Sequence, residues 1–230
     1  MNKTKIEWAD YTWNPVTGCL GPKGDGVRCH YCYANRLAHG RLKNVYLRHR
    51  LIAGEVDDPF APRSAGGLLD PMGKKGGRIF VCSMGELFGD WMPAEWAERI
   101  LGVAKCCPQH TFLFLTKWPQ NLAQFNPWPP NCWIGATATD EESAWAAQSG
   151  LWDADASVRF ISFEPLLGPI ESDRLCKIQW AIVGAQTGPG AVAPSPTWVR
   201  QIQRAADIWG TKVFLKDNLH WPEHIQEYPK

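Results

Sequence analysis

The sequence of 230 residues lacks any apolar run of about 18 residues, the length from which a membrane-spanning helix is expected. It also lacks, near its start, the apolar core of a secretory signal peptide. We therefore expect a cytoplasmic protein with no membrane contact. Disulfide frameworks are rare in such proteins, so the eight cysteines are expected to be free thiols or metal ligands.

An excess of charge of either sign is also missing, because the formal net charge is +1. A chain with so little net charge has no overall electrostatic field that attracts a polyanion. This argues against tight, salt-sensitive binding of duplex nucleic acid. Acidic residues are nonetheless absent from Arg28 to Arg50, where six lysines or arginines fall. A block of this kind is usually a solvated helix face. Here it directly follows three cysteines, which favours contact with an anionic ligand.

Short apolar runs alternate with helical patterns along most of the chain. The apolar runs predict strands at 11–16, 78–83, 111–116, 132–137, 158–163, 179–184 and 212–216. Apolar periodicity and capping residues predict helices at 93–107, 140–152 and 195–210. Repeated βα units predict an α/β protein with about six to seven parallel strands, either a doubly wound sheet or a partial (β/α) barrel.

The segment 52–77 is rich in glycine, proline and charge, and it interrupts the βα pattern. We expect a single domain over 1–230 with a loop insertion at this point. A loop of this length in a compact domain is either functional, such as a lid, or a disordered tip. The sequence leaves both interpretations open.

Polar residues follow nearly every predicted strand. Because ligands of βα folds bind at the carboxyl ends of the strands, these residues are candidates for a site, although each alone is more commonly a turn or cap residue. The candidates are Ser83, Gly85, Glu86, Lys117, Thr137, Thr139, Glu164, Gln186 and Lys216.

Three cysteines, Cys19, Cys29 and Cys32, fall in one predicted loop. Thiolates suit zinc or iron–sulfur clusters. A structural zinc site needs a fourth ligand, for which His30 and His39 are the candidates. A [4Fe–4S] cluster with three cysteines instead leaves one iron open. The remaining cysteines are interpreted as buried small hydrophobic residues, namely Cys82, Cys106, Cys107, Cys132 and Cys176.

Three cysteines after the first strand of a predicted βα barrel resemble the radical S-adenosylmethionine (SAM) superfamily. The first gap holds nine residues here, which departs from the common Cys-x-x-x-Cys-x-x-Cys spacing. The wider pattern resembles a phage- and prophage-encoded three-cysteine-motif family related to radical SAM enzymes of the spore photoproduct lyase type. The matching segments are TKIEWADYTWNPVTGC, CHYCYANRLA, FVCSMGELF, PQHTFLFLTKWP, VRFISFEPLLGPI and WAIVGAQTGPGA.

This resemblance implies a role for each candidate. The implied ligands of a [4Fe–4S] cluster are Cys19, Cys29 and Cys32. The implied contacts to SAM are Ser83, Gly85, Glu86, Thr137, Thr139 and Lys216. The implied catalytic residues are Glu164, Gln186 and Lys117. Gln186 stands where the family usually has an acid, and a glutamine cannot act as a base.

The resemblance also implies a reaction in which the reduced cluster cleaves SAM to a 5′-deoxyadenosyl radical that abstracts hydrogen from an anionic substrate. The implied substrate is a nucleic acid base or nucleotide, and the implied electron donor is a flavodoxin or ferredoxin; a partner protein is a further candidate. Two alternatives stay open. One is a non-enzymatic nucleic-acid-binding βα domain with a Cys₃His zinc site, and the other is a hydrolase or transferase with incidental cysteines.

Overall fold

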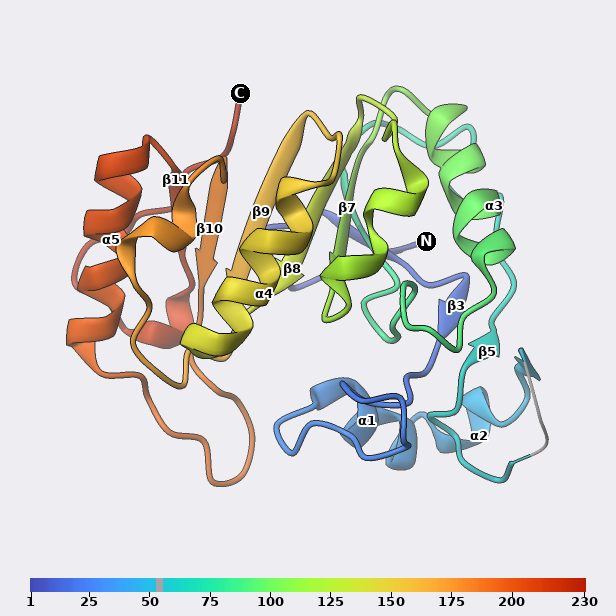
Figure 1. Ribbon diagram of the computed structural model, residues 1–230. Coiled ribbons are helices and arrows are strands. Elements are labelled where there is room, and N and C mark those ends of the chain that lie inside the picture. The colour runs from blue at the N-terminus through green and yellow to red at the C-terminus, as the bar shows by residue number, and fades with distance from the viewer. Residues whose placement is uncertain (53–55) are drawn as a thin grey trace.

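The computed structural model describes residues 1–52 and 56–230 and is built around one eight-stranded sheet (Figure 1). All neighbouring strands are parallel except the edge pair β1 and β2. In sheet order the strands are β1 (Asn2–Lys3), β2 (Tyr11–Trp13), β6 (Arg78–Val81), β7 (Thr111–Thr116), β8 (Cys132–Thr137), β9 (Val158–Phe163), β10 (Trp180–Val183) and β11 (Lys212–Leu215).

The prediction of an α/β protein with six to seven parallel strands is confirmed, since β2 and β6 to β11 run parallel. The sheet stays open, because β1 and β11 lie at its two edges. Strand order follows chain order without the reversal of a doubly wound sheet. The arrangement is therefore a mostly parallel sheet that is not closed. None of the helices in residues 1–52 and 56–230 has the length and hydropathy that crossing a bilayer requires.

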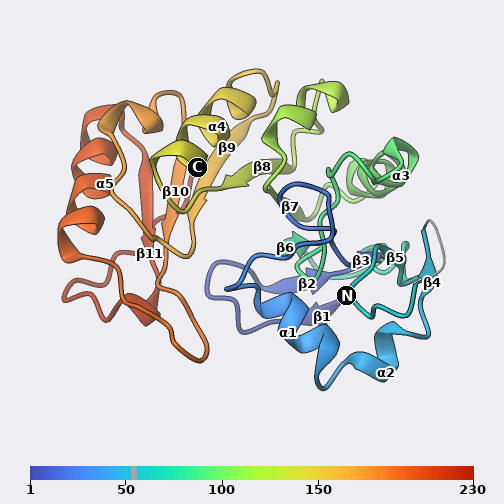
Figure 2. The same cartoon turned by 60° about the horizontal axis from the view of Figure 1, so that its bottom comes forward.

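Three helices cover one face of the sheet, α3 (Ala94–Lys105), α4 (Glu141–Trp152) and α5 (Pro196–Trp209) (Figure 2). Each agrees with a predicted helix to within a few residues. The Ser195 side chain accepts a hydrogen bond at the start of α5, and Gly210 ends that helix with a φ of 69°. The short helices η1 (Pro119–Asn121), η2 (Ala123–Phe125) and η3 (Ser172–Leu175) complete the remaining crossovers.

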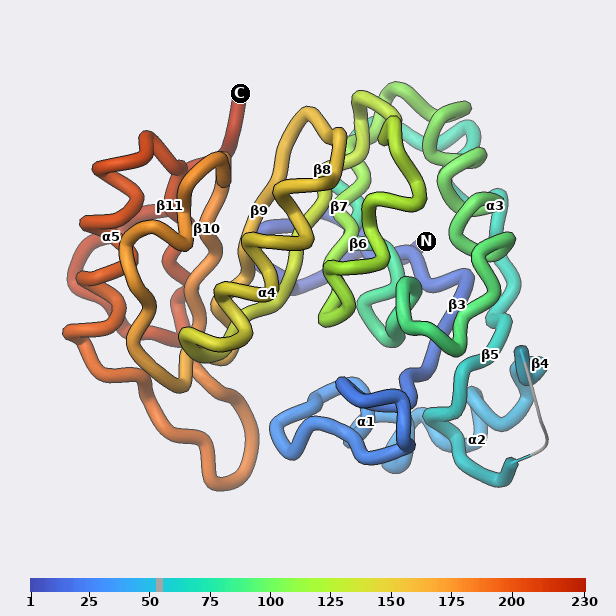
Figure 3. The backbone as a smooth tube through the Cα atoms, viewed as in Figure 1, coloured from blue at the N-terminus to red at the C-terminus, as the bar shows by residue number. Residues whose placement is uncertain are grey.

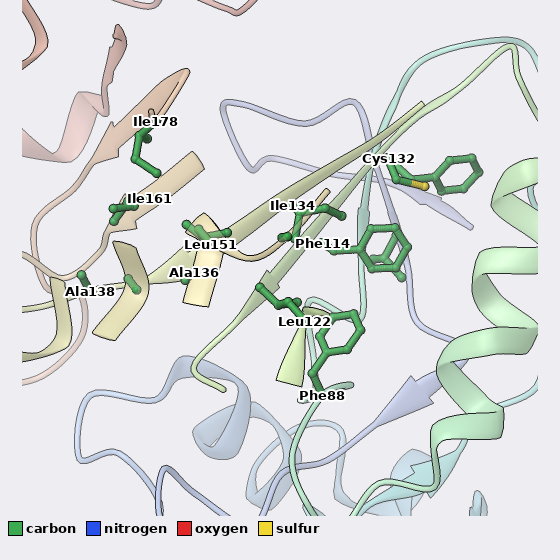
Figure 4. Close-up of a cluster of buried hydrophobic side chains, with 14 of the residues drawn as sticks. Phe88, Phe114, Leu122, Cys132, Ile134, Ala136, Ala138, Leu151, Ile161 and Ile178 are labelled. Carbon is green, nitrogen blue, oxygen red and sulfur yellow. The ribbon is translucent and has the colours of Figure 1, made fainter. Parts of the chain in front are cut away.

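Side chains alternate between two buried clusters on opposite faces of the sheet. In β7, Phe112 and Phe114 pack on the helix-covered face, whereas Leu113 between them packs on the other face. Figure 4 shows part of the larger cluster, between the strands and α4. The second cluster is rich in aromatic rings and forms the inner wall of the sheet; it contains Trp8, Phe80, Phe160, Trp180 and Phe214.

We predict that Asp140→Ala destabilises the protein by about 1 kcal/mol. Asp140 caps α4, because its carboxylate accepts hydrogen bonds from the Ser143 amide at 2.9 Å and from the Ser143 hydroxyl. Urea unfolding at neutral pH measures the loss. Glu142→Ala removes an exposed acid from the same turn and is expected to cost less than half as much. Equal losses for both variants would contradict the capping role.

A smaller lobe lies at the carboxyl end of the parallel strands and carries the cysteine loop (Figure 3). It contains α1 (Tyr33–His39), α2 (Lys43–Tyr46) and a second sheet of β3 (Val16–Thr17), β5 (Arg63–Ser64) and β4 (Arg50–Leu51). The predicted strand 11–16 is therefore too long: β2 ends at Trp13, and Val16 pairs with Ser64 instead.

The predicted insertion 52–77 supplies part of this lobe, although residues 53–55 lie outside the described residues. Phe60, Ala61 and Arg63 are buried, and the Arg63 guanidinium donates to the backbone oxygens of His49 and Asp58. Residues 60–64 are packed, which contradicts the interpretation as a disordered tip, and Phe60 lines a cavity that is described below.

Candidate functional site

A cavity of about 450 Å³ lies between the carboxyl ends of the parallel strands and the cysteine loop. All the predicted site residues except Thr139 line it. These are Cys19, Cys29, Cys32, Ser83, Gly85, Glu86, Lys117, Thr137, Glu164, Gln186 and Lys216. Residues from the first to the last parallel strand therefore meet in one place, as the strand-end rule predicts.

Cys19 is held by backbone contacts among three segments that are distant in the sequence. Its amide donates to the oxygen of Phe60 at 2.9 Å, while the Gly18 amide donates to the oxygen of Met84 at 2.9 Å. The Glu86 amide donates in turn to the oxygen of Gly18 at 3.0 Å. The first cysteine is thus tied both to the insertion and to the segment after β6.

Cys32 and Cys19 are further fixed by local hydrogen bonds to their sulfur atoms. Cys32 is the N-cap of α1, and its Sγ accepts from the amide of Asn35 at 3.3 Å. The Sγ of Cys19 accepts from the amide of Gly21 at 3.1 Å. Burial raises the pKa of the Cys19 thiol to about 12, and the charge of Glu86 adds to this effect. Burial also raises the pKa of Cys32, and a bound metal cation would lower the pKa of both thiols.

The geometry does not favour a mononuclear zinc site. Within residues 1–52 and 56–230, no three His, Cys, Asp or Glu side chains are placed to hold one metal ion. Zinc requires ligands that converge at about 2.0–2.3 Å from a single centre. Neither His30 nor His39 lines the cavity, and the His39 ring lies 3.2 Å from Asp58. An iron–sulfur cluster makes a different demand, since each thiolate binds a separate iron atom.

Glu86 and Lys117 place opposite charges at the cavity wall. The Oε1 atom of Glu86 accepts from the Thr116 hydroxyl at 2.6 Å and from the Phe88 amide at 3.0 Å. Its Oε2 atom accepts from the Lys117 amide at 3.0 Å. Burial raises the pKa of Glu86, which these hydrogen bonds partly oppose.

Lys117 lies among the cysteines at the same wall. Burial lowers the pKa of the Lys117 ammonium, whereas the charges of Cys29 and Glu86 oppose that shift. The Lys117 Nζ lies 5.6 Å from the centre of the Tyr31 ring, and it forms no salt bridge within the described residues. This ammonium is therefore free to meet an anionic ligand.

A second charged pair lies across the cavity. The Lys216 ammonium donates to the carboxylate of Glu164, and Gly184 lies beneath both side chains. A Cβ atom on Gly184 would lie 3.0 Å from Lys216 and 3.2 Å from Glu164. Gln186 follows on the same loop. Glu164 and Lys216, predicted to act separately, thus form one ion-paired unit.

Two further candidates make contacts that anchor the backbone. The Ser83 hydroxyl donates to Asn14 Oδ1 at 3.1 Å, which also accepts from the Met84 amide. Thr139 donates from its hydroxyl to Asp140, and its amide donates to the Ser143 hydroxyl at 2.8 Å. Since Thr139 does not line the cavity, its contacts are those of the turn that begins α4.

Several residues that line the cavity are not predicted as site residues from the sequence. Trp8 precedes the first predicted strand, and Arg28 was grouped only with the basic block. Cys82 was interpreted as a packing residue, yet it is both buried and part of the cavity wall. Cys106, interpreted in the same way, is exposed, so that interpretation is wrong. Ser162 also lines the cavity. Its sequence position could have indicated this, because it is a polar residue at an inward position of a buried strand.

Four polar atoms of the lining residues have no hydrogen-bond partner within the described residues. They are Trp8 Nε1, Arg28 Nε, Trp118 Nε1 and Ser162 Oγ. All four can donate a hydrogen bond. Each of these atoms is itself buried, so these donors do not face the open space of the cavity.

Two solved structures of spore photoproduct lyase resemble this chain in fold. One, complexed with dinucleoside spore photoproduct, aligns with a TM-score of 0.54 and 10% identity, covering 93% of this chain and 78% of that chain. The other, a tyrosine-to-phenylalanine mutant, aligns with a TM-score of 0.52 and 9% identity over the same shares.

At this identity the likeness concerns the fold alone. No curated protein matches the chain. Residues 3–228 match the model of a family described as proteins of unknown function, DUF5131, and the chain belongs to that family.

Proposed function

We propose that this protein is a radical SAM enzyme. Cys19, Cys29 and Cys32 would hold a [4Fe–4S] cluster, and the adjoining cavity would take SAM and the substrate. One observation carries the proposal: three thiols from one loop reach a single cavity at the carboxyl edge of a parallel sheet. The fold likeness to spore photoproduct lyase supports it.

The charges of the cavity fit the amino acid part of SAM. That part carries an ammonium and a carboxylate, and Glu86 and Lys117 present the complementary charges at one wall. Glu86 Oε2 accepts only one hydrogen bond within the described residues, so it has room for another donor. Ser83 and Thr137 would contact the remaining polar groups of SAM.

When bound, the cluster and SAM supply one-electron cleavage of a carbon–sulfur bond and abstraction of a hydrogen atom from the substrate. The residues of this chain bind, orient and exclude water. Trp8, Phe80 and Leu115 form an apolar inner wall, which keeps solvent from the reacting atoms. The Glu164–Lys216 pair and Gln186 would orient the substrate, and Gln186 can hydrogen-bond to it but cannot act as a base.

The substrate we propose is anionic, a nucleic acid base or a nucleotide. Two acidic residues line the cavity, Glu86 and Glu164, against three basic ones, Arg28, Lys117 and Lys216, which favours an anionic ligand. Trp8 and Trp118 line the cavity but are buried against other aromatic rings, so they shape its wall rather than offer an open stacking face. The dinucleoside bound to the spore photoproduct lyase structure adds support by likeness.

Anaerobic reconstitution tests the proposal. We expect a coloured protein containing iron and sulfide, with an electron paramagnetic resonance spectrum after reduction that changes when SAM is added. A protein that takes up no cluster would refute the proposal. A colourless protein with one bound zinc would instead support the Cys₃His alternative.

We predict that Lys117→Met weakens SAM binding by about ten-fold or more, because it removes the ammonium that would bind the SAM carboxylate at the cavity wall. Equilibrium binding to the reconstituted protein measures the effect. Lys177→Met is the matched control. The Lys177 Nζ atom lies 3.6 Å from the centre of the Trp152 ring, and Lys177 does not line the cavity. Equal affinities for the two variants would place the SAM carboxylate elsewhere.

A further inference from the structure

Four cations stand on the outer surface of the small lobe and have no acidic partner among the described residues. Arg41, Lys43, Arg48 and Arg50 are all exposed, and none lies in a salt bridge of residues 1–52 and 56–230. We call these four residues the basic segment. By contrast, Arg28 is paired with Asp58 at 2.7 Å, and Arg36 donates to the Thr187 oxygen.

The basic segment and the cysteines belong to the same small packing unit. Cys19 and Cys32 contact a minor core that includes Ala34, Ala38 and Tyr46, the buried residues of α1 and α2. The exposed cations fall on and directly beside α2, outside that core. The basic segment therefore lies on the outside of the packing unit that also holds Cys19 and Cys32.

We propose that the basic segment is the docking surface for an acidic one-electron carrier, such as a flavodoxin, that reduces the cluster. This inference rests on the proposed function. One electron leaves the reduced carrier and enters the [4Fe–4S] centre, with no bond made or broken. Complementary charge would orient the carrier on the lobe that holds the cysteines, where the path through the protein is short.

The same cations suit a nucleic acid less well. Single strands bind where cations alternate with exposed aromatic rings that stack on the bases. The large apolar side chains exposed on the described part of α1 and α2 are Tyr33 and Val45, and Tyr33 lines the cavity. The basic segment thus offers charge without stacking surfaces, which fits a folded acidic protein.

The experiment titrates oxidised flavodoxin into metal-free and cluster-loaded protein at low ionic strength by calorimetry. We expect binding that weakens as salt rises, and a loss of about ten-fold or more in the double variant Arg41→Glu/Lys43→Glu. The matched control is Lys74→Glu/Lys75→Glu. These exposed lysines precede β6, at the amino ends of the parallel strands and so away from the small lobe, and we expect their reversal to leave the affinity within about two-fold.

A kinetic arm separates docking from the proposed chemistry. Reduced flavodoxin should reduce the cluster more slowly in Arg41→Glu/Lys43→Glu, whereas dithionite, which needs no docking surface, should reduce it at the wild-type rate. Absence of a cluster in the wild type would refute the proposed function, and the titration of metal-free protein would still report docking. The inference is overturned by wild-type protein that does not bind flavodoxin, or by a double variant that binds it normally. It is equally overturned if the variant loses affinity only for a single-stranded oligonucleotide.

Discussion

Cys29→Ser protein is expected to leave anaerobic reconstitution with almost none of the iron and sulfide that the wild type takes up. Cys29 lies in the same loop as Cys19 and Cys32, and all three line the cavity. Serine is a poor ligand for iron in such clusters, and two thiolates leave two irons without a protein ligand. Iron and sulfide assays, together with the visible absorption of the cluster, measure the loss.

Two other cysteines provide controls of different kinds. Cys106→Ser changes an exposed thiol at the end of α3 and should leave cluster content unchanged. Cys82→Ser changes a buried thiol of the cavity wall, so it tests whether Cys82 supplies the fourth ligand. We expect the Cys82→Ser cluster to keep its response to SAM. Full cluster content in Cys29→Ser would show that the cysteine loop is not the cluster site.

The bounds of the central strands can be predicted from the sequence because these strands lie in a uniformly apolar environment. Strands β7, β8 and β9 match the predicted ranges 111–116, 132–137 and 158–163. Each is buried on both faces, so its apolar residues run nearly without interruption and both ends are clear. Asp140 marked the start of α4 for an equally local reason, since a cap needs only its own turn.

The arrangement of the site depended on contacts that no local pattern encodes. Val16 and Thr17 do not continue β2. They form β3, which pairs with Ser64 and Arg63, about fifty residues away along the chain. The pairing of Glu164 with Lys216 likewise joins the ends of β9 and β11. Thr139 follows a strand, which predicts a site residue, but its hydrogen bonds belong to the turn before α4. The positions of polar residues at strand ends therefore predict where the site lies. Contacts between distant segments determine which side chains meet there.

Gly18→Ala is expected to destabilise the protein by roughly 3 kcal/mol or more and to lower cluster content at the same time. Gly18 has a φ of 93°, in the left-handed region that disfavours any side chain. An added Cβ would also lie 2.3 Å from the backbone oxygen of Ala61, which cannot move without the insertion. Gly18 pairs with Gly85 across the cavity wall, so the strain reaches both Cys19 and the segment before Glu86.

Gly66→Ala separates the two causes of that loss. Gly66 has a φ of 76° but no atom within 4 Å of an added Cβ, so its substitution carries the backbone cost alone, about 1 kcal/mol. Urea unfolding of the metal-free proteins gives both free energies, and iron content after reconstitution gives the effect on the site. We expect Gly66→Ala to keep its cluster. If both variants lost the same stability, and Gly18→Ala took up iron like the wild type, the close approach of Gly18 to Ala61 would not be what holds the first cysteine in place.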